Sequence, residues 1–495
     1  MLTSLLAVPL AGVIALVPIT NTSPHSGSRM KRVALGVSLL NFIISMVLWG
    51  EFDSSTSEYQ FTQEFLANQV TFCHLQIGID GISLYFVLLT TFITPICILS
   101  NWDSIIHGLK YFLIAFLVLE TLLIAVFVVL DILLFYIFFE SVLIPLFLIV
   151  GIWGGSATRV RAAFLLFLYT LFGSLFMLLA FLVMYYNVGS TDFGVLALSE
   201  IHPDSQRLLW LAIFVSMAIK TPTWPFQIWL LRAHAEAPVA GSVILAAIVL
   251  KLATYGYMRI LLQFFPDASD YFSPLVQTVA VITIIYASLA TLRQTDFKAM
   301  IAYSSVAHMG VVLLGLSSNT IQGIEGAILL GIAHAFVSPA LFILLGGVLY
   351  DRYHTRTIRY YRGMTAYMPL FSLFFFLFTI FNSAVPLSVN WAGEFLSLTG
   401  TFQQNALAAF LGSTGIVLSA GYSIWLYNRI SFGSWSKYLS YTTDLTRREF
   451  MLLLTLLIPT VLFGIFPNVI LDTLHVSVST LLYSTNPLFI TQYVN

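Results

Sequence analysis

Lys220 and Lys251 lie in a stretch of sequence that is otherwise strongly apolar, and Pro222 and Pro225 closely follow the first of them. Inside a membrane a lysine costs at least about 2.5–3.5 kcal/mol, so a helix that carries one needs a partner or a watery cavity. Because proline removes a backbone donor and clashes with the preceding turn, we expect Lys220 to end one half-helix and Pro225 to begin another. Interrupted helices mark ion paths in transporters. The pattern therefore predicts a titratable lysine at a helix break, on a route for protons or cations.

Five further ionisable residues fall within apolar runs, and they are acids and imidazoles: Glu120, Glu140, His308, His334 and Glu394. Proton relays need groups whose affinity for a proton can be changed by burial and by neighbouring charges. We expect Glu140 to pair with Lys220, so that separating the two would favour release of the lysine proton. Histidine titrates near neutrality and can pass protons on.

Each of these residues also has a structural interpretation. Glu120 could be half of a static salt bridge, and Lys251 could be paired permanently with a carboxylate. His308 and His334 could join helices by hydrogen bonds without any transport role. Lys220 and Glu140 fit this interpretation less well, because a helix break with prolines has no packing advantage by itself.

Three more polar residues lie where two apolar runs meet. His234 and Glu236, in the sequence AHAEAP, are expected near the membrane interface, where they could form either a solvated turn or a gate. Asp131 lies at a junction between apolar runs and is expected at the surface.

The elements that must position these residues are membrane spans. Hydrophobic residues make up 59% of the 495 residues and charged residues 9%, and mean hydropathy is +0.93. A soluble domain has roughly 25% charged residues, so this composition predicts an all-α, polytopic membrane protein. About fourteen spans of ~20 residues can be placed. They fall near 1–18, 33–50, 77–100, 110–130, 132–152, 160–186, 207–232, 238–264, 271–290, 299–317, 321–349, 367–400, 404–429 and 448–470.

Charge supports this count, because alternating spans separate basic loops from acidic loops. One side receives Arg29, Lys31, Arg32, Lys110, Arg159, Arg161, Arg293, Lys298, Arg352, Arg356, Arg359, Arg362, Lys437, Arg447 and Arg448. The other receives Glu51, Asp53, Glu58, Glu64, Asp192, Glu200, Asp204, Asp267 and Asp270, with Arg207 as its one clear basic residue. By the positive-inside rule, both termini are expected on the outer face.

No soluble domain or cofactor motif fits the remaining sequence. The longest polar connections, 51–76 and 187–206, are short loops, and the glycines of GIWGGS from Gly151 lack Walker or dinucleotide spacing. Cys73 and Cys97 are too few for a disulfide framework or a four-thiolate metal site. The net charge of -1 argues against nucleic acid as a partner. We therefore expect no cofactor or metal in this chain, and any coupled redox chemistry in another subunit.

The interrupted spans also indicate internal repetition. Lys220 lies at the break of the seventh span, and Glu394 follows Pro386 in the twelfth. The two interrupted spans are five spans apart. Because five is an odd number, two successive five-span units would lie inverted in the membrane, as in many transporters. The predicted organisation is 1–109 (three spans), 110–265 (first repeat, spans 4–8), 266–430 (second repeat, spans 9–13) and 431–495 (a loop and the last span).

Six segments carry a resemblance to a known family. They are DILLFYIFFESVLIPLFLIVGIWG from Asp131, RAAFLLFLYTLFGS from Arg161, KTPTWPFQIWL from Lys220, AHAEAPVAGSVILAAIVLKLATYG from Ala233, TLRQTDFKAMIAYSSVAHMG from Thr291 and WAGEF from Trp391. Through them the chain resembles the antiporter-like membrane subunits of NADH:ubiquinone oxidoreductase (respiratory complex I), a family shared with cation/proton antiporters of the Mrp type. The resemblance covers nearly all of residues 80–430.

The resemblance implies roles for particular residues. Glu140, Lys220, Lys251 and Glu394 match the family's proton-channel residues, and His308 and His334 match its second half-channel. A glutamate at 394 looks like the chain 4 branch, because the sister chains 2 and 5 usually carry lysine there. The family is also known for inverted five-helix repeats.

The same resemblance implies a setting for the chain. It implies a mitochondrial inner membrane, or a bacterial plasma membrane, with other membrane-arm subunits and neighbouring antiporter-like chains as partners. NADH, FMN, iron–sulfur clusters and ubiquinone are expected in partner subunits. The implied activity is proton translocation driven by quinone reduction elsewhere in the complex.

Two departures from the family pattern concern the helix breaks. The usual sequence in the family is PFHxWLPxAH. This chain has Gln227 in place of the first histidine and Leu231 in place of the second proline. Gln227 cannot titrate, and Leu231 would let the second half of the seventh span run longer. The stretch PLSVN before Trp391 also differs from the usual glycine-rich sequence, so the twelfth-span break could have another shape.

Two other function classes stay open. An Mrp-type cation/proton antiporter subunit would share almost all of these features, and Na⁺-dependent transport would distinguish it. A purely structural membrane subunit would hold its buried charges in permanent pairs.

Overall fold

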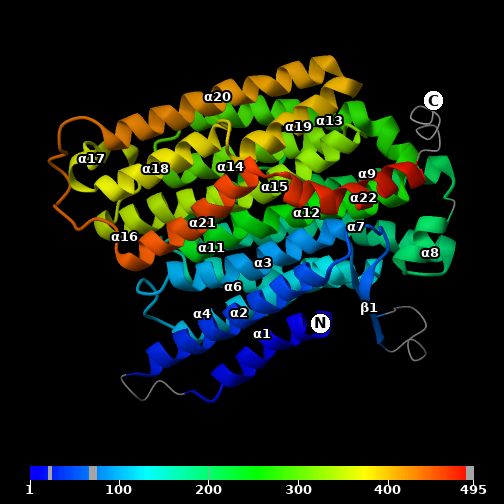
Figure 1. The fold of residues 1–495 in the computed structure, drawn as a ribbon, viewed down its shortest axis with the longest axis horizontal. Helices are drawn as coiled ribbons and strands as arrows, with labels where there is room; N and C mark the ends of the chain where they lie inside the picture. The colour runs from blue at the N-terminus through cyan, green and yellow to red at the C-terminus, as the bar shows by residue number, and fades with distance from the viewer. Residues whose placement is uncertain (20–24, 66–74, 200, 486–495) are drawn as a thin grey trace.

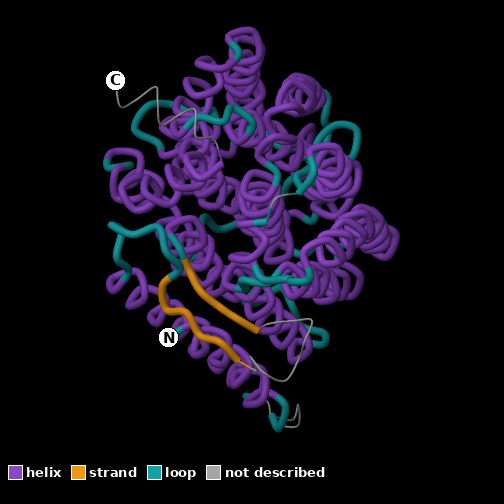
Figure 2. The backbone as a smooth tube through the Cα atoms, turned by 90° about the vertical axis from the view of Figure 1, so that its right-hand side faces the viewer, coloured by secondary structure: helices purple, strands orange, loops and turns teal. Residues whose placement is uncertain are grey.

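The computed structural model describes residues 1–19, 25–65, 75–199 and 201–485, so Cys73 and Glu200 lie outside the described residues. Within these ranges the chain is a bundle of long helices, as expected for the all-α class (Figure 1). A small antiparallel hairpin of β1 (Gln60–Phe65) and β2 (Leu75–Ile79) was not predicted. Figure 2 shows the hairpin lying across one end of the bundle, close to the N-terminus.

Among the described residues, eleven helical segments are long and apolar enough to cross a membrane. Seven are single helices: α2 (Ser26–Glu51), α3 (Gly81–Ser100), α4 (Leu109–Val128), α7 (Arg159–Val188), α13 (Pro266–Leu292), α14 (Phe297–Leu316) and α20 (Ala406–Ser431). An eighth is α21 (Arg447–Ile465). The other three are composite: α5 (Ile132–Ser141) with α6 (Leu143–Trp153); α11 (Val239–Ile244) to α12 (Leu250–Gly256) and η2 (Tyr257–Leu262); and α15 (Ile321–Leu341) to α16 (Tyr350–Tyr353).

The three remaining predicted spans correspond to shorter or broken helices. α1 (Leu2–Leu16) has only 15 residues. The seventh span is observed as α9 (Pro203–Lys220) and α10 (Ile228–Glu236), and the twelfth as α18 (Pro369–Asn382) and α19 (Val389–Gln404). The predicted interruptions are therefore present in the structure. The second half of the seventh span begins at Ile228, not at Pro225, because the residues between Lys220 and Ile228 are taken up by turns.

The C-terminal helices differ from the prediction of one span over 448–470. α21 ends at Ile465, Pro467 follows, and a further helix, α22, runs over Asn468–Thr485. Proline cannot continue a helix from the preceding turn, which accounts for the end of α21. Asp472, His475 and several hydroxyl residues interrupt the apolar periodicity of α22, so this helix was not predicted.

The two kinds of loop lie at opposite ends of the bundle. The turns around α16 and α17 (Met364–Tyr367) and the connection from α20 to α21 gather at one end, which we call the basic end (Figure 1, left). The hairpin, α8 (Phe193–Leu198) and the start of α1 lie at the other end. This is the charge separation that the sequence predicts.

Two local features place the buried polar residues. π-Helical turns, η1 (Leu245–Val249) and η3 (Phe342–Leu349), interrupt the eighth and eleventh spans, and such turns shift the register of the side chains that follow.

α15 and α19 also pack very closely through glycines. A Cβ atom at Gly393 would lie 2.6 Å from the backbone nitrogen of Leu330, and one at Gly326 would lie 2.4 Å from that of Ser397. Small residues permit this approach, which brings His334 of α15 near Glu394 of α19.

Candidate proton-translocation site

Lys220 is the last residue of α9 and is buried. Its Nζ donates a hydrogen bond to the carbonyl oxygen of Phe139 (3.1 Å) and lies 3.4 Å from the centroid of the Phe139 ring. A cation is favoured at a helix C-terminus and over an aromatic face. At the break, a carbonyl oxygen, an aromatic ring and the helix dipole therefore stabilise the buried ammonium group.

Side chains at the break satisfy the backbone carbonyls that end α9. The hydroxyl groups of Thr221 and Thr223 donate to the carbonyls of Met217 (2.6 Å) and Ala218 (3.1 Å). The indole of Trp229, in α10, donates to the carbonyl of Ile219 (2.8 Å). Because the unpaired groups of a helix end need partners when they are buried, these three side chains stabilise the interruption.

The predicted pair of Glu140 and Lys220 is not in direct contact. No ion pair within 4.0 Å joins these side chains, whereas Lys220 reaches the carbonyl of the adjacent Phe139. Glu140 is half-buried near the end of α5, and its Oε1 has no hydrogen-bond partner among the described residues. The expectation of a formed pair is therefore wrong for this state: the two groups are near enough to interact electrostatically but are separated.

Lys251 and His334 form a direct link between the eighth and eleventh spans. Nζ of Lys251 donates to the carbonyl of Ala246 (2.6 Å) and lies 2.8 Å from Nδ1 of His334. When Lys251 is charged it can only donate, so Nδ1 of His334 then accepts and Nε2 carries the hydrogen. Both side chains are buried, and Lys251 has no carboxylate within 4.0 Å in the described ranges. The alternative of a permanent lysine–carboxylate pair is thus not what the structure contains.

His308 and Glu394 form a second link. Nδ1 of His308 lies 2.9 Å from Oε1 of Glu394, and Nε2 lies 3.2 Å from Oδ1 of Asn382. The amide nitrogen of Asn382 donates to Ser423 (3.3 Å), so Oδ1 accepts from Nε2. The contact between His308 and Glu394 then needs one more proton, carried either by the imidazole or by the carboxyl group.

The two links lie close together. The ring centroids of His308 and His334 are 5.9 Å apart. We call the series Lys251, His334, His308 and Glu394 the central relay. All four side chains are buried, and they come from four different spans. Within the described residues no hydrogen bond joins Lys220 to this relay, so the predicted site residues do not form one continuous series of contacts.

Glu120 lies apart from the central relay, on α4. Its Oε1 accepts a hydrogen bond from Nδ2 of Asn41 (2.8 Å), and its Oε2 has no partner among the described residues. The structure therefore does not contain the static salt bridge considered for Glu120. It also does not bring this residue to the other predicted site residues.

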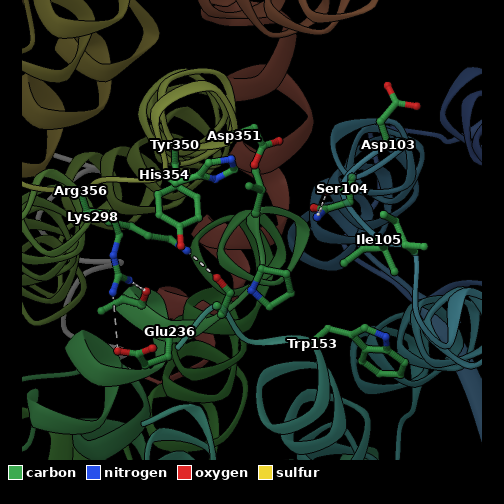
Figure 3. Close-up of a pocket in the computed structure, with 18 residues that line it drawn as sticks. Asp103, Ser104, Ile105, Trp153, Glu236, Lys298, Tyr350, Asp351, His354 and Arg356 are labelled. Carbon is green, nitrogen blue, oxygen red and sulfur yellow. Dashed lines mark hydrogen bonds and ion pairs between the residues drawn. The ribbon is translucent and has the colours of Figure 1, made fainter. Parts of the chain in front are cut away.

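A cavity opens at the basic end of the bundle, and Figure 3 shows its lining. Its volume is about 470 Å³, and it is lined by Glu236, Lys298, Asp351, His354 and Arg356 among others. Nζ of Lys298 donates to the carbonyl of Ala237 (2.5 Å). Arg356 lies 3.9 Å from Glu236 and 3.4 Å from Asp296. We call this space the basic-end cavity.

His234 is buried behind the basic-end cavity, not in a solvated turn. Its ring stacks on Phe342 at 4.8 Å, and both ring nitrogens lack a partner among the described residues. It is close enough to Lys298 and Lys251 to interact electrostatically with both. Glu236, in contrast, accepts hydrogen bonds from Ser156 and Thr158 at the cavity wall.

A second cavity, of about 650 Å³, lies between α19 and α20 at the other end of the relay. Glu394 is the ionisable residue in its lining, which is otherwise mostly apolar and includes Trp391, Phe395 and Phe410. The second carboxylate oxygen of Glu394 has no partner in the described part of the chain. The relay thus ends at a cavity on the Glu394 side.

Two ion pairs that involve buried residues were not predicted from the sequence. Arg259 is buried near the end of the eighth span, and its guanidinium lies 2.6 Å from Asp80, which also caps α3. Asp80 lies near the start of the predicted span 77–100, and its position in the sequence carried no signal that it pairs with Arg259. Glu325 lies 2.7 Å from Nδ1 of His475, a residue on the unpredicted helix α22. Asp131, expected at the surface, is also buried, because it caps α5 through the amides of Leu133 and Leu134.

The two departures from the family pattern have visible consequences. Gln227 is buried, and its Oε1 has no partner among the described residues. α10 continues through Leu231 as far as Glu236. At the twelfth-span break, Ala384 (φ 54°) and Leu387 (φ 76°) adopt left-handed backbone conformations, which glycine would adopt without strain.

Comparison with known proteins shows the family to which the chain belongs. The family described as "NADH:quinone oxidoreductase/Mrp antiporter, TM" matches residues 129–419, which is more than half of the chain. The chain belongs to this family. NADH-ubiquinone oxidoreductase chain 4 of Mycosarcoma maydis is 79% identical over 486 residues, covering 98% of this chain and 100% of that protein. The protein of the same name from Arabidopsis thaliana is 48% identical over 482 residues, covering 97% and 96%.

Two solved structures show the same fold. A chain of respiratory complex I from Thermus thermophilus is 25% identical, with a TM-score of 0.88 and coverage of 98% of this chain and 100% of that chain. A chain of the Mrp complex from Dietzia sp. DQ12-45-1b is 17% identical, with a TM-score of 0.86 and coverage of 100% and 99%. The antiporter-like membrane fold is therefore shared with both assemblies.

Proposed function

We propose that this chain is a proton-translocating membrane-arm subunit of NADH:ubiquinone oxidoreductase, with the central relay as its proton path. Family membership and the similarity to chain 4 proteins over nearly the full length support the assignment to the complex. The observation that carries the mechanism is the buried series of titratable groups from Lys251 to Glu394. Quinone reduction takes place in other subunits.

The arrangement of groups supports a stepwise mechanism. Redox work in the complex changes the charge state of Glu140. This change alters how tightly Lys220 holds its proton. A proton passes from Lys220 to Lys251, and then through His334 and His308 to Glu394. The gap between Lys220 and Lys251 requires water or a movement of side chains at that step.

The two cavities suggest where protons join and leave this path. Lys298 lines the basic-end cavity, and His234 is close enough to interact electrostatically with both Lys298 and Lys251, so protons reach the relay from the basic end by this route. Glu394 lines the cavity between α19 and α20 and delivers protons towards the opposite face. Half-helix ends at both breaks supply partial charges that favour these steps. Glu120 has at most a secondary role, since it lies apart.

The chain crosses the membrane fourteen times. Eleven crossings are the long segments, and the other three are α1, the pair α9 and α10, and the pair α18 and α19. Residues 110–265 and 266–430 form two inverted repeats, each containing one broken helix. The basic end faces the mitochondrial matrix, and both termini face outward, in accordance with the positive-inside rule. The first three spans form an N-terminal segment, and residues 431–495 close the C-terminal end.

The partners are other membrane-arm subunits, including neighbouring antiporter-like chains. NADH, FMN, iron–sulfur clusters and ubiquinone belong to partner subunits. Support for this comes from the names of the relatives and from the complexes in which the similar structures occur.

The test is substitution of Lys220 by alanine in the assembled complex. We expect electron transfer from NADH to an artificial acceptor to continue and proton pumping to fall. Glu140→Gln is expected to give the same separation of the two activities. Unchanged pumping with normal coupling in Lys220→Ala would refute the proposed path.

A second candidate function is favoured by the fold shared with the Mrp complex. An antiporter of that class exchanges Na⁺ for protons. Vesicles containing the complex would then show Na⁺-dependent proton movement that is abolished by Lys220→Ala. If movement of protons does not depend on Na⁺, this candidate is excluded.

A further inference from the structure

A third cavity, of about 980 Å³, lies at the basic end and differs in charge from the basic-end cavity. Its lining contains four cationic side chains and no acidic residue among the described residues. The cations are Arg359, Arg362, Arg429 and Lys437. We call it the cationic cavity. In the basic-end cavity, by contrast, Arg356 is compensated by Glu236 and Asp296.

The four cations have no partner within the described part of the chain. Among the described residues, none of them forms an ion pair or a side-chain hydrogen bond, and all four are exposed. Neighbouring arginines do have partners: Arg352 binds Glu449 at 2.8 Å, and Arg448 binds Asp103. Like charges held close together are unfavourable unless an anion lies between them. The cavity is therefore suited to an anion from outside the chain.

The walls of the cationic cavity are tied together by backbone contacts. The amide of Ile358 donates to the carbonyl of Thr295 (3.0 Å), which joins the 357–362 segment to the end of α13. The amide of Gly363 donates to Phe432 (3.2 Å), and the hydroxyl of Thr365 donates to Ser431 (2.7 Å), which joins the segment to the end of α20. The cations are thus mounted on segments whose relative positions are fixed.

The side of the cavity towards the membrane is apolar and aromatic. Trp425 lines the cavity and is exposed, and next to it Ile424 of α20 is exposed. Leu289 and Leu292, on the last turns of α13, are exposed on the helix that packs against α20. Tyr438 and Tyr360 pair at 5.4 Å in the cavity wall. Aromatic rings at this level are typical of the membrane interface, and apolar side chains below them offer a surface for acyl chains.

We propose that the cationic cavity binds the phosphate-bearing headgroup of an anionic phospholipid, with its acyl chains against α13 and α20. Arginine donates paired hydrogen bonds to phosphate oxygens, and basic pockets between membrane helices bind anionic lipid headgroups. A free phosphate ion has the same headgroup chemistry but would make no use of the exposed leucines and Trp425. The lipid is therefore the occupant that uses both parts of the surface.

The test uses the assembled complex in phosphatidylcholine nanodiscs that contain a small fraction of spin-labelled phosphatidylglycerol or diphosphatidylglycerol. A juxtamembrane cation contributes roughly 1 kcal/mol, which is about a fivefold effect on affinity. We expect each of Arg359→Gln, Arg362→Gln, Arg429→Gln and Lys437→Gln to weaken retention of the anionic lipid about fivefold. The fourfold variant should lose more than about 100-fold.

The matched control replaces four exposed arginines outside the cavity, Arg29, Arg32, Arg161 and Arg447, by glutamine. It removes the same charge from the basic end and is expected to retain the lipid. Equal loss in both fourfold variants would mean general attraction to the surface and would overturn the proposal. If the fourfold variant does not assemble, the four single variants decide the question.

Two further outcomes would overturn the proposal. Binding of inorganic phosphate that depends on the four cations, without retention of anionic lipid, would make free phosphate the ligand. Loss of a neighbouring subunit from the fourfold variant, with lipid retained, would make the cavity a protein contact. Retention of the anionic lipid by wild type and by the control variant, with loss from the cavity variant, supports the assignment.

Discussion

Nδ1 of His308 lies 2.9 Å from Oε1 of Glu394, while Nε2 of the same ring lies 3.2 Å from Oδ1 of Asn382. Since Asn382 fixes a hydrogen on Nε2, the imidazole and the carboxyl group share one further proton between them. A buried pair of this kind can take up or release that proton with a small movement of either side chain. This relationship sets the first prediction.

Glu394→Gln should abolish proton transfer through this subunit. The amide keeps the volume of the side chain but cannot carry the shared proton, and loss of a positioned acid–base group typically slows transfer about 10²–10⁴-fold. Proton pumping by reconstituted complex, with NADH oxidation by an artificial acceptor as the reference, measures the effect. The matched control is Glu325→Gln, which alters a buried glutamate outside the relay. Equal pumping by Glu394→Gln and wild type would contradict the role of this residue.

Lys251→Met should keep the complex assembled and remove pumping. Methionine fills most of the space of the lysine stem and needs no partner, while the links to Ala246 and His334 are lost. If the buried charge of Lys251 had only a structural role, the Lys251→Met variant would either be fully active or fail to assemble. The amount of assembled complex on a native gel and the ratio of protons to electrons distinguish these results.

Gly393→Ala should displace α19 from α15. The added Cβ would lie 2.6 Å from the nitrogen of Leu330 and 2.7 Å from its Cα, and such overpacking typically costs about 1–3 kcal/mol. Because Glu394 is the next residue, we expect lower thermal stability together with reduced pumping. Gly421→Ala is the control, since a Cβ there meets nothing within 4 Å. If both variants behave alike, close packing at Gly393 does not position the relay.

Arg259→Met should destabilise the subunit by about 3–5 kcal/mol, because it leaves the buried carboxylate of Asp80 without its counter-ion. The double variant Arg259→Met with Asp80→Asn removes both charges, and the asparagine retains an oxygen that can cap α3. We expect the double variant to recover part of the loss in thermal unfolding of the complex. A double variant that is less stable than Arg259→Met alone would contradict this account.

The sequence predicted the membrane class, the two helix breaks and the residues of the relay, because each depends on local composition. Lysine in apolar sequence and proline after Lys220 are strong signals, and alternation of charge between loops fixed the order of the spans. α22 escaped prediction because its polar residues obscure an apolar face that packs against α3 and α15.

Contacts between distant residues could not be predicted in the same way. Whether Lys220 meets the side chain of Glu140 or the carbonyl of Phe139 depends on the rotation of α5 relative to α9, which no local pattern specifies. The burial of Arg259 depends on Asp80, 179 residues earlier in the chain. The link from Lys251 to His334 likewise depends on π-helical turns, which are not apparent in the sequence.

The separation of Lys220 from the central relay has a consequence for energy conservation. A membrane crossed by an unbroken file of exchangeable groups would leak, and the gradient built by respiration would be dissipated as heat. Because the path is interrupted before the central relay, conduction there occurs only when hydration or a shift of side chains bridges the gap. The rest of the enzyme can then prevent backflow by controlling this junction.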